Sequence, residues 1–113
     1  MFVEGFYMAW VQLILAGLLE VAWSAFLKMS EGFSKLGFSV AAVVGMVASF
    51  LLLAQATKVL PLGTAYGIWT GIGALGAVVV GILLFREPAT VPRLFFAGLL
   101  LIGIVGLKVT SGH

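Results

Sequence analysis

Four long apolar segments, separated by short charged connections, divide this chain and dictate what it can fold into. A helix rises about 1.5 Å per residue, so about 20 apolar residues cross the ~30 Å hydrocarbon core of a bilayer. The fourth segment is shorter and needs its flanking residues to complete the span. The sequence therefore predicts an all-α membrane protein, one domain over residues 1–113, with helices at about residues 8–28, 38–57, 64–85 and 94–110.

Composition supports lipid as the solvent. Of 113 residues, 63% are hydrophobic and 9% are charged, whereas soluble domains carry roughly 25% charged residues. The connections 29–37, 58–63 and 86–93 are too short to form a soluble domain. The chain is therefore expected to cross a membrane several times.

Several function classes lack the residues they need. The chain has no cysteine, and its single histidine is the last residue, His113. We therefore expect no metal site, no cofactor and no enzymatic activity. The basic residues are scattered singly, without the basic stripe that nucleic-acid binding needs.

The first seven residues precede the first apolar segment. Glu4 is their only charge, so the positive region of a cleaved signal peptide is absent. We expect a short interfacial extension there, because Phe and Tyr are stable at headgroup depth.

Loop charges give the chain little preference for one orientation. Four helices place both termini on one side of the membrane. Lys28, Lys35, Arg86 and Arg93 lie on the opposite side, against Lys58 and Lys108 on the side of the termini. With so small a difference in positive charge, insertion in both orientations is plausible.

Glu20 is the outlier among the apolar segments. Counted from Met8, it lies about 18 Å into a helix of about 30 Å, near the bilayer midplane. A permanent ion pair is the structural alternative, but all six basic residues lie at segment ends. An acid at this depth marks a substrate or proton pathway. We expect Glu20 to bind the proton and the substrate.

Polar and small side chains are expected to line this site. Gly17 lies one turn before Glu20, and Trp23 and Ser24 lie one turn after it. Trp23 could instead anchor the interface, although it is several residues inside Lys28. The remaining lining candidates, each able to donate a hydrogen bond, are Ser49, Tyr66 and Trp69. Ser49 could alternatively bond its own helix backbone.

Glycines interrupt the last two segments. Gly71, Gly73 and Gly76 fall within six residues of the third segment, where they favour a bend. Gly98, Gly103 and Gly106 lie in the fourth, where small residues let helices approach closely. Four helices scarcely enclose a pathway, so we expect a dimer with two facing copies of Glu20. The two carboxylates then titrate as a coupled pair, and protons and an organic cation compete for them.

The sequence resembles the small multidrug resistance family, in particular its guanidinium exporter subtype, from Met8 to Ser111. The central Glu and the Ala-Tyr-x-Ile-Trp pattern are family-wide, and Trp23, the Thr-Gly-Ile-Gly run and Lys108 indicate the subtype. The segments that carry the resemblance are Ala16-Gly17-Leu18-Leu19-Glu20-Val21-Ala22-Trp23, Ser30-Glu31-Gly32-Phe33-Ser34, Pro61-Leu62-Gly63-Thr64-Ala65-Tyr66-Gly67-Ile68-Trp69-Thr70-Gly71-Ile72-Gly73 and Gly106-Leu107-Lys108.

The resemblance implies an antiparallel, dual-topology homodimer in the inner (plasma) membrane of a bacterium, which exports a cation in exchange for protons. It implies that Ser49 and Trp69 hold the Glu20 carboxylate, that Tyr66 is linked to switching, and that the fourth helix makes the main dimer contact. Ser24 and Gly67 depart from the residues common in the subtype and put the substrate range in doubt. Some relatives of this kind form heterodimers with a paralogue.

We therefore expect proton-coupled export of guanidinium and small guanidinyl or quaternary ammonium cations. The alternative within transport is a broader exporter of aromatic cations. A small ion channel is a further alternative, and a scaffold without transport would leave the midplane Glu20 unexplained.

Overall fold

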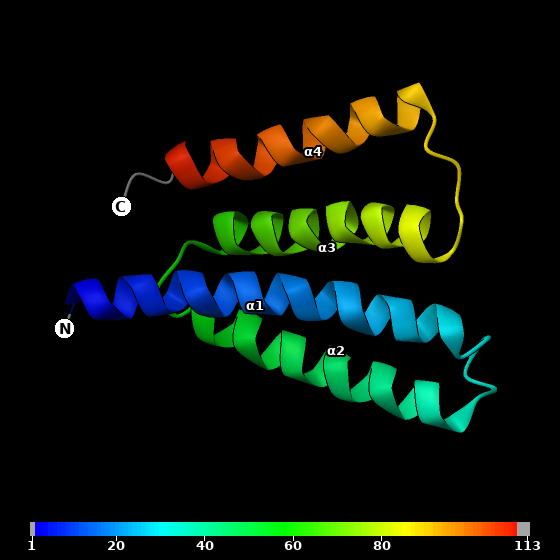
Figure 1. Ribbon diagram of the computed structural model, residues 1–113. Coiled ribbons are helices and arrows are strands. Elements are labelled where there is room, and N and C mark those ends of the chain that lie inside the picture. The colour runs from blue at the N-terminus through cyan, green and yellow to red at the C-terminus, as the bar shows by residue number, and fades with distance from the viewer. Residues whose placement is uncertain (1, 111–113) are drawn as a thin grey trace.

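Four helices make up the chain over residues 2–110, which are the residues that this computed structural model describes. They are α1 (Phe2–Met29), α2 (Leu36–Ala56), α3 (Leu62–Leu84) and α4 (Val91–Thr110). All four are long and apolar enough to cross a membrane. Consecutive helices run in opposite directions (Figure 1). The prediction of an all-helical protein with four potential membrane spans is confirmed.

The first helix begins earlier than the sequence suggested. The expected start was Met8, after an interfacial extension, but α1 already begins at Phe2, and the candidate membrane span begins at Gly5. The segment before Met8 contains no proline and no Ser, Thr, Asp or Asn that would cap a helix beginning at Met8. Nothing in the sequence therefore separates the extension from the helix that follows.

The helices form a row in which α1 and α3 are central. The backbone of α1 contacts α2 and α3, whereas that of α4 contacts only α3 among the described helices (Figure 1). The described residues of α4 include no buried one. One helix of the subunit is thus left almost uncovered by its own chain.

The apolar core lies near the end of the bundle where α2 connects to α3. Its buried members include Leu13 and Ala16 of α1, Ala56 at the end of α2, Leu60 in the connection that follows, and Ile68 of α3. Glu20 follows this core along α1. The most tightly packed part of the subunit therefore ends one turn before the acid.

The glycines of α3 allow close packing against both neighbours. A Cβ atom at Gly71 would lie 2.7 Å from Ile104 Cγ1 of α4, and one at Gly76 would overlap the side chain of Val21 on α1. Real Cβ contacts are longer than this. The run that favoured a bend is part of one uninterrupted helix, Leu62–Leu84, and the glycines serve helix approach instead.

A tight turn connects α1 and α2. Ser30 is fully buried there. Its Oγ donates to the Leu27 carbonyl at 2.6 Å and accepts from the Phe33 backbone N–H at 3.0 Å. Glu31, Gly32 and Phe33 all have positive φ values, of 50°, 74° and 67°. The serine thus holds a turn that two non-glycine residues would otherwise disfavour.

Candidate functional site

Glu20 projects from α1 toward α3 at Gly73. A Cβ atom at Gly73 would overlap the Glu20 carboxyl group and lie 2.9 Å from its Cγ. The absence of a side chain at Gly73 is therefore what gives the carboxyl group its place. The sequence interpretation treated Gly73 only as part of a glycine cluster. The small residues of this segment predict a close contact with another helix. The sequence does not show which helix makes that contact.

Three buried polar atoms of α1 have no hydrogen-bond partner within residues 2–110: Trp10 Nε1, Glu20 Oε2 and Trp23 Nε1. Glu20 and Trp23 are three positions apart and so share one side of the helix. Glu20 also forms no salt bridge with any described residue, the pairs found being Lys35–Glu31 and Arg93–Glu87. Buried polar groups are normally bonded, so an unsatisfied acceptor beside an unsatisfied donor indicates a binding position.

Ser49 links three helices beside this position. Its Oγ donates to the Ala16 carbonyl of α1 at 2.7 Å and accepts from Trp69 Nε1 of α3 at 2.9 Å. The Ser49 hydroxyl is completely buried. The resemblance implied that Ser49 and Trp69 hold the carboxylate. In the structure they bond to each other and to the backbone one turn before Glu20, not to Glu20 itself.

Aromatic rings surround Trp69. Tyr66 lies one turn earlier on α3 with its ring centroid 5.4 Å from that of Trp69, and Phe50 of α2 approaches to 5.6 Å. Trp69 is buried at 7% exposure, whereas Tyr66 is 54% exposed. Tyr66 thus covers the buried indole and presents its own ring at the surface of the subunit.

The small residues near Glu20 act mainly as contact points between helices. A Cβ atom at Gly17 would lie 2.7 Å from Ile72 Cγ2 of α3, and one at Gly45 would lie 2.9 Å from Trp23 Cβ. Gly45, which the sequence interpretation did not select, therefore determines how closely α2 approaches the Trp23 backbone. Trp23 and Gly17 are thus positioned by neighbours on two different helices.

Ser24 does not join the unsatisfied pair. Its Oγ donates to the Val21 carbonyl of its own helix at 2.9 Å. The residue lines a separate small pocket toward the 86–93 connection. The Ser24 hydroxyl therefore bonds within α1 and takes no part in the Ser49–Trp69 bond.

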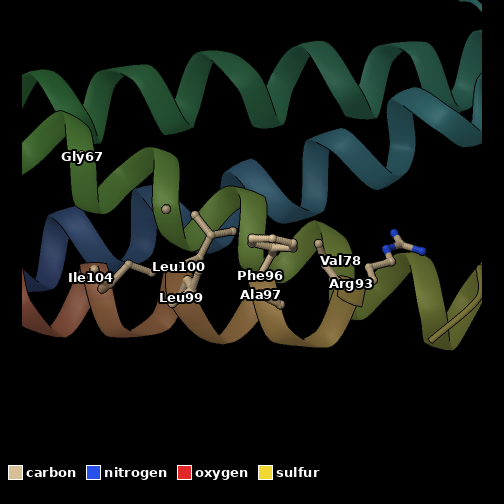
Figure 2. A pocket seen from close by; sticks show the side chains of 10 residues that line it. Gly67, Val78, Arg93, Phe96, Ala97, Leu99, Leu100 and Ile104 are labelled. Carbon is tan, nitrogen blue, oxygen red and sulfur yellow. The ribbon is translucent and has the colours of Figure 1, made fainter. Parts of the chain in front are cut away.

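A long apolar groove lies between α3 and α4 on the outside of the subunit (Figure 2). Its volume is about 680 Å³. Arg93 lies at one end, and Phe96, Leu100 and Ile104 follow along α4 (Figure 2). Gly103 also lines this groove, and a Cβ atom at Gly98, Gly103 or Gly106 would meet nothing within 4 Å. Among the described residues, these three glycines therefore make no close contact with another helix of the same chain.

No described part of the chain brings three or more His, Asp or Glu side chains together as a metal would require. The chemistry that the site offers is a carboxyl group in apolar surroundings, with indole and hydroxyl groups close by. Such a group is neutral when it holds a proton, and in its charged carboxylate form it can bind an organic cation.

Comparison with known proteins gives consistent matches. The family model described as Small Multidrug Resistance protein matches residues 8–111. The guanidinium exporter of Yersinia pseudotuberculosis is 54% identical over 104 residues, which cover 92% of this chain and 100% of that protein. The guanidinium exporters of Salmonella typhimurium and Escherichia coli K12 are 52% and 51% identical, each over 92% of this chain and 99% of the relative.

Proposed function

This chain belongs to the small multidrug resistance protein family, and from this membership we propose that it exports guanidinium and small guanidinyl or quaternary ammonium cations in exchange for protons. Its four potential spans make it a multi-pass membrane protein. The matched exporters come from bacteria, so the membrane we assign is the bacterial inner membrane.

The observation that carries the proposal is the buried, unbonded Oε2 atom of Glu20. A carboxylate in hydrocarbon without a basic partner is stabilised either by a proton or by a bound cation. Because both use the same oxygens, binding of one releases the other. This competition is the simplest way to couple an outward flux of cations to an inward flux of protons.

Guanidinium suits the surroundings of Glu20. It is planar and presents forked N–H donors that pair with both oxygens of a carboxylate. Trp23 lies on the same side of α1, and the indole of Trp69 is held close by through Ser49. Flat walls of this kind favour a flat cation over a bulky spherical one.

The remaining predicted residues have supporting roles in this proposal. Ser49 and Trp69 fix α2 and α3 against α1 beside Glu20. Tyr66, half exposed beside Trp69, lies along the pathway and responds when access changes sides. Gly17 keeps α3 close to α1.

The proposed assembly is an antiparallel homodimer. Support comes from α4, which has no buried residue among those described, and from Gly98, Gly103 and Gly106, where a Cβ atom would meet nothing within 4 Å. A second copy seated in the α3–α4 groove would cover this surface. Insertion in two orientations supplies by assembly the inverted repeat that larger transporters encode in one chain.

Purified protein in liposomes tests the function. A pH gradient should drive guanidinium uptake, and Glu20→Gln should abolish it, because an amide neither releases a proton nor binds a cation by charge. Glu31→Gln is the matched control, since Glu31 is an exposed loop acid paired with Lys35. Undiminished, proton-driven uptake by Glu20→Gln would refute the proposal.

A further inference from the structure

A second pocket lies between α1 and α3, toward the end of the bundle that carries the 29–37 and 86–93 connections. Its volume is about 140 Å³. Ser24 and Lys28 of α1 line it, together with Phe85 and Glu87. Glu20, Ser24 and Lys28 are spaced by four residues and therefore share one side of α1. The pocket thus continues the Glu20 side of the helix toward the membrane surface.

The Phe85 ring forms the aromatic wall of this pocket, and the Lys28 ammonium already lies over it. The Lys28 ammonium lies 5.4 Å from the centroid of the Phe85 ring, within the range of a cation–π interaction. Lys28 is in the last turn of α1, and Phe85 ends α3. The chain's own ammonium therefore marks where a positive charge is stable at this end of the subunit.

The acidic wall is held rigidly. Arg86 has a positive φ of 56° and reverses the chain, and the Glu87 N–H then donates to the Gly81 carbonyl at 3.0 Å. A Cβ atom at Gly81 would overlap the Glu87 carboxyl group. Arg93 pairs with Glu87 Oε1. The carboxyl group is thereby fixed at the edge of the pocket by the backbone on one side and by Arg93 on the other.

We propose that this pocket is an outer binding site in which the transported cation displaces the Lys28 ammonium from Phe85 on its way to or from Glu20. The proposal rests on the proposed transport function and adds a second position on the route. A guanidinium ion stacked on Phe85 has N–H groups to donate to Glu87 Oε2 and to the Ser24 hydroxyl. Since Ser24 uses its proton on the Val21 carbonyl, its oxygen is left to accept.

The local charge balance favours an exchange over simple addition. Lys28 and Arg93 are positive and Glu87 is negative, so a further cation would meet net positive charge if Lys28 stayed in place. Lys28 has a flexible stem and can turn its ammonium outward to the headgroup region. When a cation enters as the lysine leaves, the charge facing Glu87 and Arg93 does not change.

Opposite effects of two substitutions test this exchange in proteoliposome transport. Lys28→Met removes the competing ammonium and should lower the KM for guanidinium about two- to fivefold, the factor that a single exposed cation–π contact corresponds to. Phe85→Leu removes the aromatic wall and should raise the KM by a similar factor. In the double variant Lys28→Met should no longer lower the KM, because the Phe85 ring from which it removes the ammonium is absent.

Matched controls separate this effect from general damage. Lys35→Met and Phe38→Leu remove the same groups elsewhere at the same end of the subunit and should leave KM unchanged. Phe85→Tyr keeps the ring, so it should restore most of the affinity that Phe85→Leu loses, which distinguishes loss of stacking from misfolding. Shifts of Lys28→Met and Phe85→Leu in the same direction, or no shift in either, would overturn the outer site. Failure of the unaltered protein to transport guanidinium would instead reject the proposed function.

Discussion

At the scale of single residues, Gly73 is the position on which the Glu20 site depends most directly. The carboxyl group occupies the volume that any other residue at this place would fill with its Cβ atom. The same region holds Ser49, whose one hydroxyl satisfies a carbonyl of α1 and an indole of α3. Gly73 thus leaves room for a side chain of another helix, and Ser49 forms hydrogen bonds to two other helices.

Gly73→Ala should weaken guanidinium binding by about fivefold or more. Overpacking a well-packed site costs about 1–3 kcal/mol, and here the displaced group is the carboxyl group that we propose binds the cation. Isothermal titration with guanidinium measures the loss. Gly37→Ala is the control, since a Cβ atom there would meet nothing within 4 Å. Equal affinities for the two variants would contradict this account of the site.

Ser49→Ala should lower the thermal stability of the detergent-solubilised protein. The substitution leaves the buried Trp69 Nε1 without its acceptor, and an unsatisfied buried donor costs about 1–3 kcal/mol. Tryptophan fluorescence during heating follows the transition. Ser39→Ala removes a hydroxyl that only bonds its own helix at an exposed position. If both variants unfold at the same temperature, the two hydrogen bonds of Ser49 contribute nothing to stability.

At the scale of the elements, the sequence predicts the helices far better than it predicts what lies between them. Length and hydrophobicity are properties of one segment, so four potential spans could be recognised directly. The start of α1 could not, because no capping residue or proline marks it. Ser49 shows the same limit at the site, since its partner Ala16 depends on how α1 and α2 are packed together. For the same reason Gly45 was missed, and Gly73 was named only as part of a glycine cluster, without its contact to Glu20.

The groove beside α4 carries a prediction at this scale. Gly103→Ile should shift the protein toward monomers in mild detergent, because a branched side chain would project from the face on which we propose that a second copy packs. Size-exclusion chromatography with light scattering measures the molar mass. Leu83→Ile, on an exposed part of α3, should leave the dimer intact. A Gly103→Ile variant with undiminished dimer content would argue for another interface.

At the scale of the whole molecule, the coupling of protons to cations that we propose predicts a definite pH dependence. A protonated Glu20 has no charge for guanidinium, so acid conditions should weaken binding and alkaline conditions should restore it. Where one proton competes with one cation, the apparent Kd rises toward tenfold for each unit by which the pH falls, about 1.4 kcal/mol. Titrations over a range of pH values measure this slope. A Kd that does not vary with pH would exclude a shared site.

The isolation of α4 has a consequence for gene dosage. In the dimer that we propose, α4 supplies the contact surface, and none of its described residues is buried by its own chain. The number of dimers should then depend on how many copies share an area of membrane. In the sparse regime the number of pairs follows the square of the copy number, so halving expression should lower export about fourfold. Export would then rise more steeply than the amount of protein that the cell makes.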